Sequence, residues 1–161
     1  MVIAGVVASV LVVNAVFPAL TRSSNSIVRI SEKVDERIQS QVSIIYAASE
    51  KDENGAWQDT NADSKFDVWV WVKNVGASRI LGIDQTDVFF GVEGNFARIP
   101  YADDAAGTYP RWTYSLENGA EWKNTVTAKI DIKYSTSLSQ DTYTIKVVTP
   151  SGAYDSYFLS F

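Results

Sequence analysis

The sequence contains no cysteine and no histidine among its 161 residues. Without cysteine the chain forms no disulfide and has no thiolate nucleophile, and without histidine it lacks the commonest general base. The same two absences remove the ligands of most zinc and iron sites. No Gly-x-Ser-x-Gly motif and no glycine-rich phosphate loop occurs either. The sequence therefore predicts a protein that is not an enzyme.

Positive charge is also scarce. The chain has 14 lysines and arginines against 19 acidic residues, which gives a formal net charge of −5 and a pI of about 4.7. Nucleic-acid-binding domains carry an excess of basic residues that pair with phosphates. The charge balance therefore predicts no nucleic-acid partner.

Charge of either sign is absent from residues 1–20, which are almost entirely apolar. A helix needs about 20 apolar residues to cross a hydrocarbon core of ~30 Å, so this run predicts a membrane-spanning or bundle helix. Asn14 and Pro18 interrupt its last third, and a cleaved secretory signal or a buried helix of a soluble protein are the alternatives. Because the apolar run begins directly at Met1, we expect that an upstream piece is missing.

Two patterns indicate that this part of the chain mediates assembly. Gly5, Ala8 and Ser9 place small residues on one helix face, where they let a neighbouring helix approach closely. Residues 21–48 continue with apolar residues at steps of three and four, which predicts an amphipathic helix. The positions of this stripe are Ile27, Ile30, Val34, Ile38, Val42 and Ile45. The predicted helical part therefore covers residues 1–48, although the β-branched residues in 42–45 could already begin a strand.

Residues 49–161 show the alternation and the turn signals of short β-strands. The expected strands are residues 67–73, 80–81, 87–92, 96–101, 112–116, 124–134, 141–148 and 153–161. Seven or eight strands at this spacing predict an immunoglobulin-like β-sandwich. The predicted fold class is thus α+β, with a long hydrophobic and amphipathic helix over residues 1–48 followed by an all-β domain over residues 49–161.

One acidic loop resembles a calcium-binding loop in its spacing. Asp59, Asn61, Asp63 and Asp67 supply oxygen atoms at positions 1, 3, 5 and 9, and the backbone carbonyl of Lys65 falls at position 7. The glycine at position 6 and the glutamate at position 12 of such loops are missing. The interpretation we favour is a solvated acidic turn, and a calcium site held by Asp59, Asn61, Asp63, Lys65 and Asp67 is the alternative.

Five tryptophans and eight tyrosines raise the possibility of sugar binding, since exposed rings stack on sugars. We expect Trp69 and Trp71 to point to opposite faces of their strand, so that at most one is exposed. Aromatic residues also fill sandwich cores and contacts between subunits, which is the interpretation we favour. The final segment, residues 154–161, is expected to supply contacts between copies.

Three segments together resemble the archaellum (archaeal flagellum) family of type IV pilin-like proteins. They are residues 7–20, residues 70–76 with Arg79 and Ile80, and residues 87–96. In these segments the resemblance is greater to the accessory proteins of the family than to its filament flagellins. The basic leader, cleavage-site glycine and early glutamate of flagellins are absent after Met1, which either disfavours a flagellin or means that the leader has been removed.

The resemblance implies a structural role in motility rather than catalysis. The chain would be tethered to the archaeal cell membrane by its N-terminal helix, with the β domain outside the cytoplasm, as an envelope anchor or stator accessory. Its partners would be copies of itself, other archaellum subunits and the surface layer. One alternative is a filament-forming archaellin with its helix in the filament core. Another is a membrane-tethered adhesin or carbohydrate-binding module.

Overall fold

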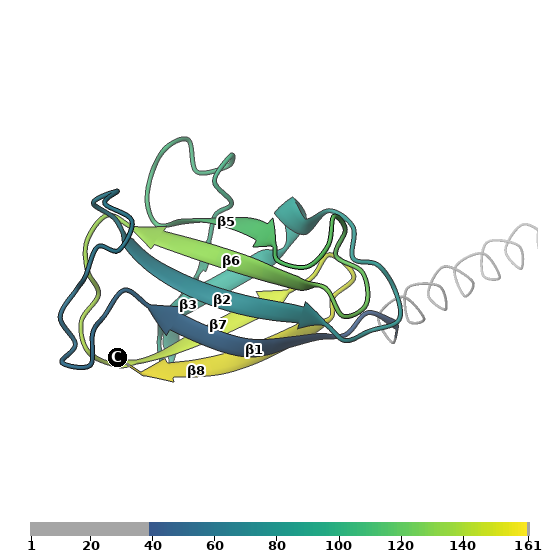
Figure 1. The fold of residues 1–161 in the computed structure, drawn as a ribbon, viewed down its shortest axis with the longest axis horizontal. Helices are drawn as coiled ribbons and strands as arrows, with labels where there is room; N and C mark the ends of the chain where they lie inside the picture. Colours follow the sequence, from purple (N-terminus) through teal and green to yellow (C-terminus); the bar gives the residue numbers. More distant parts are fainter. Residues whose placement is uncertain (1–38, 161) are drawn as a thin grey trace, which may run out of the picture. The chain divides into compact units, whose positions relative to one another are not determined.

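Eight β-strands form the part of the chain that the structure, a computed structural model, describes, which is residues 39–160 (Figure 1). A single short 3₁₀ turn, η1 (Ile83–Gln85), interrupts the strands. The strands in chain order are β1 (Val42–Ser49), β2 (Phe66–Asn74), β3 (Asp87–Val92), β4 (Asn95–Ile99), β5 (Arg111–Leu116), β6 (Thr127–Tyr134), β7 (Thr142–Val148) and β8 (Tyr154–Ser160).

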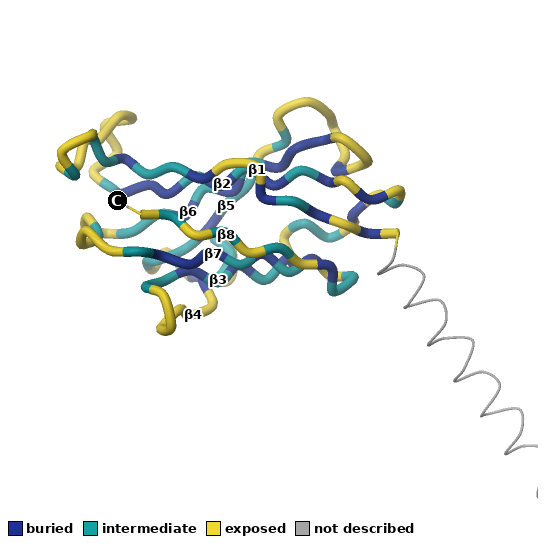
Figure 2. The backbone as a smooth tube through the Cα atoms, turned by 90° about the horizontal axis from the view of Figure 1, so that it is seen from below, coloured by how far each residue is buried: buried dark blue, intermediate teal, exposed yellow. Residues whose placement is uncertain are grey.

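The strands pair into two antiparallel four-stranded sheets, ordered β1-β2-β6-β5 and β4-β3-β7-β8. Figure 2 shows them as two layers, one above the other. The first order corresponds to strands A-B-E-D of an immunoglobulin-type sandwich and the second to C′-C-F-G. The predicted β-sandwich is therefore confirmed.

The core lies between the sheets and follows from the alternation of each strand. On β2, Val68, Val70 and Val72 are fully buried, whereas Trp69 and Trp71 lie on the outer face and are half-buried. The expectation that these two tryptophans point to opposite faces was wrong, because side chains two residues apart in a strand share a face.

The strand β1 begins earlier than the predicted domain boundary. Residues 42–48, which were expected to end the helix, pair with β2 from Val42↔Asn74 to Ser49↔Val68. Val42 and Ile44 face the core, and the register shifts between Ile44 and Tyr46 through a bulge at Ile45. The alternative reading of this segment as the first strand was thus the right one, since β-branched residues pack well on a pleated surface.

A second correction concerns residues 80–81, which form no strand. Ile80 makes only an isolated bridge with Trp122, and Leu81 is exposed. The predicted assembly positions Gly5, Ala8, Ser9, Ile27, Ile30, Val34 and Ile38 lie outside the described residues. Within residues 39–160, no helix has the length and apolar character needed to span a bilayer.

Candidate interaction surfaces and the acidic loop

The outer face of the β1-β2-β6-β5 sheet is toward the viewer in Figure 1. It carries three aromatic rings and one lysine that we call the aromatic face: Tyr46, Trp69, Trp71 and Lys129. The ring centroids of Tyr46 and Trp71 lie 5.3 Å apart. The Lys129 ammonium nitrogen lies 5.2 Å from the Trp69 centroid and 5.3 Å from that of Trp71. Both contacts have cation–π geometry, so the lysine holds the two indoles in place.

The outer face of the β4-β3-β7-β8 sheet is different, and we call it the phenylalanine face: Phe89, Phe96, Tyr154 and Phe158. The side chains of Phe158 and Tyr154 are 60% and 56% exposed, and Phe96 is 42% exposed. Phe89 and Phe96 make an edge-to-face contact with centroids 6.3 Å apart. Large exposed apolar side chains gathered on one sheet face are typical of protein–protein contact surfaces. Two of these residues belong to the C-terminal segment for which such contacts were predicted.

The acidic loop (residues 50–65, between β1 and β2) directs most of its side-chain oxygens at its own backbone. The Asp59 carboxylate accepts hydrogen bonds from the amides of Asp63 (3.3 Å) and Ser64 (2.9 Å). Asn61 Oδ1 accepts one from the Asp63 amide at 3.1 Å, and Asp63 Oδ1 accepts one from the Lys65 amide at 2.8 Å. These bonds shape the turn that the sequence pattern indicated.

The cation beside this loop is an ammonium group of the chain itself. Lys133 on β6 donates hydrogen bonds to Asp63 and to Asp67, the latter at 3.0 Å, and its nitrogen lies 3.7 Å from Asp131 Oδ2. Asn61 Nδ2 also donates to Asp67 Oδ2, at 2.9 Å. The structure thus brings Asn61, Asp63 and Asp67 together around Lys133.

The other two predicted calcium ligands take different positions. Asp59 stays with the turn described above, and the Lys65 ammonium lies 4.8 Å above the ring of Tyr109. In the part of the chain that the structure describes, no three acidic residues are grouped as a metal ion would need. Calcium binding stays a prediction.

Burial shifts the pKa values of this cluster. Asp67 is fully buried and its Oδ1 has no hydrogen-bond partner, so burial raises its pKa although Lys133 opposes the shift. Burial, reinforced by the Asp67 charge, raises the pKa of Asp131 to about 6. Asp63 lies at the surface, and its hydrogen bond from Lys133 lowers its pKa. Burial alone would lower the pKa of Lys133, but the hydrogen bonds to Asp63 and Asp67 raise it overall.

Glu50 fixes the start of the acidic loop and was not singled out by the sequence pattern. It is 2% exposed, and its carboxylate accepts four hydrogen bonds. The donors are the Thr60 amide (2.9 Å), the Thr60 hydroxyl (2.7 Å), Trp57 Nε1 (3.2 Å) and the Asp67 amide (3.2 Å). A buried carboxylate with this many donors is satisfied, so its role is to hold the loop against β2.

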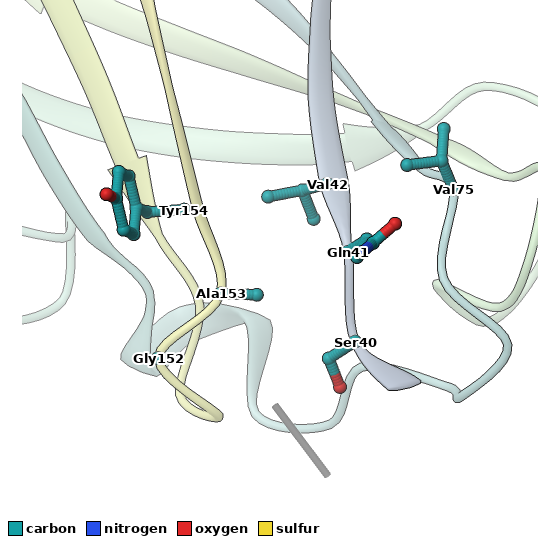
Figure 3. A pocket seen from close by; sticks show the side chains of 7 residues that line it. All are labelled: Ser40, Gln41, Val42, Val75, Gly152, Ala153 and Tyr154. Carbon is teal, nitrogen blue, oxygen red and sulfur yellow. The ribbon is translucent and has the colours of Figure 1, made fainter. Parts of the chain in front are cut away.

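A shallow pocket of about 270 Å³ lies where β1 begins, beside the turn between β7 and β8 (Figure 3). It is lined by Ser40, Gln41, Val42, Val75, Gly152, Ala153 and Tyr154. None of these is a carboxylic acid or an amine, so the pocket offers no acid–base pair for catalysis. The sheet faces are therefore the stronger candidates for function.

Comparison with known proteins decides the family. The family model for archaeal-type flagellin matches residues 1–158, almost the whole chain. The chain belongs to the archaeal-type flagellin family. An uncharacterized protein of Archaeoglobus fulgidus is 24% identical over 157 residues, covering 93% of this chain and 87% of that protein.

Two solved structures are similar to this archaeal-type flagellin family member. The archaellum periplasmic stator protein FlaG from Sulfolobus acidocaldarius is 30% identical, covers 74% of this chain and 99% of its own length, and superimposes with a TM-score of 0.56. A structure of the archaellum periplasmic stator protein complex FlaF and FlaG from the same organism matches at 28% identity over 74% of this chain and 88% of the matched chain, again with a TM-score of 0.56. The resemblance to the archaellum family, and to its accessory rather than its filament proteins, is confirmed.

Proposed function

We propose that this protein is a structural component of the archaellum that acts as an envelope anchor or stator element. The similarity to the Sulfolobus stator protein FlaG carries this proposal, because it spans 99% of that chain. The family match over residues 1–158 supports the same machinery. The proposed role is mechanical rather than enzymatic, which the lack of cysteine and histidine in the sequence supports.

Assembly with other archaellum subunits is part of this proposal. A chain similar to this one was solved in the archaellum periplasmic stator protein complex of FlaF and FlaG. The phenylalanine face offers a surface for a subunit of that kind, because Phe158 and Tyr154 expose more than half of their side chains. We propose copies of this chain and other archaellum subunits as the partners, together with a contact to the surface layer.

The location that fits these partners is the archaeal cell envelope. The uncharged apolar run of residues 1–20 supports tethering to the membrane, with the sandwich outside the cytoplasm. A static anchor needs such a tether, because a rotating filament exerts an equal and opposite torque on whatever holds it.

Deletion of the gene in the source cells tests the anchor role. Loss of swimming is expected, with restoration by the wild-type chain and not by a variant whose Phe158 and Tyr154 are both replaced by aspartate. Fractionation with mass spectrometry should find the chain in the membrane fraction and absent from sheared filaments. Undiminished swimming of the deletion strain would contradict the proposal.

The same fractionation separates the second candidate function, a filament-forming archaellin. In that case the chain would be the stoichiometric subunit of sheared filaments, with its N-terminal apolar run, residues 1–20, in the filament core. The family match alone is compatible with this function. The similarity to an accessory stator protein favours the anchor.

A further inference from the structure

The aromatic face gathers positive charge on a protein that is negatively charged overall. Four cationic side chains project from the outer face of the β1-β2-β6-β5 sheet, and only Lys133 is paired with carboxylates there. The other three are Lys73, Lys129 and Arg111. Within residues 39–160, no ion pair joins Lys73 or Lys129 to an acidic residue. These charges are therefore available to an anionic ligand.

The rings beside these charges form a row across two strands. Trp71 lies between Tyr46 and Lys129, and Trp69 contacts the same lysine from its other side. Tyr46 is 56% exposed, and its ring is tilted by 40° from that of Trp71. The face of an aromatic ring carries partial negative charge, so it attracts positively polarised groups. The C–H groups on the face of a pyranose ring are polarised in this way, and they are also apolar.

We propose that the aromatic face binds an anionic polysaccharide. Sugar rings stack on Tyr46 and Trp71, while the ammonium groups of Lys129 and Lys73 pair with carboxylate or sulfate substituents of the sugar. This ligand uses both features of the surface at once, because stacking positions the sugar ring and the ion pairs select an acidic one. The inference goes beyond the proposed anchor function and does not depend on it.

The composition of the face favours a sugar over a protein partner. Apart from the rings and Ile45, which is 52% exposed at the β1 bulge, the outward positions of the four strands are occupied by polar or small residues. They are Ser43, Ala48, Asp67, Lys73, Arg111, Thr113, Ser115, Thr127, Lys129, Asp131 and Lys133. Protein–protein interface cores are depleted in lysine and serine, whereas hydroxyl and ammonium groups are the donors that sugar oxygens need. The phenylalanine face differs in its larger exposed apolar side chains, Phe158 at 60% and Phe96 at 42%, although Arg98 and Lys146 also project from it.

Single-stranded nucleic acid is the other polymer that binds rings interleaved with lysines. Sixteen acidic residues against ten basic ones in residues 39–160 disfavour it, because most of these acids lie in the loops around the sheet. An acidic polysaccharide carries a comparable charge per unit length, so direct competition between the two polymers decides which of them the face binds.

The experiment measures binding of the full chain to four polymers: polygalacturonate, chondroitin sulfate, neutral dextran and single-stranded DNA. Quenching of tryptophan fluorescence and affinity electrophoresis report the binding. We expect the two acidic polysaccharides to bind, dextran to bind at least about tenfold more weakly, and DNA not to compete with them.

Point variants assign the site. Trp71→Ala is expected to weaken polysaccharide binding about tenfold, the effect of one lost stacking contact. Lys129→Gln should lower affinity for the acidic polymers and reduce the salt dependence of their binding. The matched controls Trp57→Ala in the acidic loop and Phe158→Ala on the opposite face should bind as the wild type does. Circular dichroism verifies that every variant is folded.

Three outcomes would overturn the inference. They are an absence of polysaccharide binding by the wild-type chain, equal binding by folded Trp71→Ala, or tighter binding of DNA than of either polysaccharide. None of these outcomes contradicts the proposed anchor function, which is tested separately by swimming and fractionation. Loss of swimming in the deletion strain together with absent sugar binding would disprove this inference alone.

Discussion

The two sheets of the sandwich have the same alternation but use their outer faces differently. The outer face of the β1-β2-β6-β5 sheet holds Lys133 between three aspartates, and beside this cluster it carries the aromatic face, with Lys129 over two indoles and Tyr46 56% exposed. The outer face of the β4-β3-β7-β8 sheet exposes Phe158 and Tyr154 by 60% and 56%, and the Lys146 ammonium lies 4.7 Å from the Tyr154 ring centroid. The cluster around Lys133 thus couples part of the first face to the stability of the fold, whereas the second face has no comparable buried ion-pair cluster among the described residues.

The largest effect on stability is expected for substitution of Lys133, on the outer face of the β1-β2-β6-β5 sheet. Replacing Lys133 by methionine leaves the fully buried Asp67 carboxylate with only the Asn61 amide as a side-chain donor. Removing one partner of a buried ion pair costs about 3–5 kcal/mol, so the free energy of unfolding at pH 7 should fall by roughly that amount. Denaturant unfolding measures it, and the exposed Lys123→Met is the control. A loss below about 1 kcal/mol would show that Lys133 does not stabilise Asp67.

A smaller loss is expected at Glu50. The change Glu50→Gln replaces one acceptor oxygen by a donor amide, which cannot accept from Trp57 Nε1, the Asp67 amide and Thr60 together. The unsatisfied donors should cost about 1–3 kcal/mol. Limited proteolysis should cut residues 50–65 faster in this variant than in the exposed control Glu53→Gln. Equal cleavage rates in the two variants would contradict the role assigned to Glu50.

The raised pKa of Asp131, on the outer face of the β1-β2-β6-β5 sheet, predicts that the stability of the fold depends on pH. Its folded pKa of about 6 lies above its ordinary value of 3.8, so the folded state binds the proton more tightly. Its contribution to stability is therefore full below pH 4 and is lost as pH rises to about 6. The variant Asp131→Asn should lack this decline. At pH 7 its free energy of unfolding should be about 1–2 kcal/mol higher than that of the wild type. Thermal unfolding between pH 3.5 and 7.5 measures the difference. Parallel profiles for the two proteins would refute it.

On the phenylalanine face, stability and association should separate. The substitution Phe158→Asp removes an exposed ring, so unfolding free energy should change by less than about 0.5 kcal/mol. Capture of archaellum subunits from solubilised envelopes should nevertheless be lost, because a charge is placed within an apolar contact. Leu81→Asp, at a 63% exposed loop position, is the matched control and should retain capture. Capture by Phe158→Asp at the wild-type level would assign association to another surface.

Calcium is expected to have the smallest effect. A bound ion stabilises the fold by mass action, so millimolar calcium should raise the unfolding temperature if the acidic loop holds it. The rise should be small in the wild type, because Lys133 already neutralises Asp63 and Asp67. Titration monitored by thermal unfolding, with magnesium as the control ion, checks this. The absence of any calcium-specific shift would favour the solvated acidic turn.

The strands were predictable from the sequence because β-branched and aromatic residues alternate in them. The stretch around Val70, for example, was placed almost to the residue. The beginning of β1 was harder to place, since Ile45 lies in a bulge and mimics the helical spacing of the preceding stripe. Residues 80–81 were predicted as a strand because two aliphatic residues follow one another there. In the structure Leu81 is exposed in a loop.

The site was less predictable than the fold. The acidic spacing of residues 59–67 was evident, but the cation between Asp63 and Asp67 comes from Lys133, which lies 66 residues beyond Asp67 and adjacent only through the pairing of β2 with β6. Glu50 likewise gains its donors from a loop closure that no local pattern encodes. The aromatic face was not predicted, because Trp69 and Trp71 were expected to lie on opposite faces of their strand.

The first strand also determines how the sandwich would carry a mechanical load. β1 pairs with β2 over its whole length, and the amide of Ile44 donates a hydrogen bond at 2.8 Å to the carboxylate of Asp155 on β8, in the other sheet. A pulling force that enters along β1 at Val42 would act parallel to the strand, so that its hydrogen bonds are sheared together instead of being unzipped one after another. The Asp155 contact would pass part of this force to the second sheet. Rupture force in single-molecule pulling would then depend on the direction of the pull.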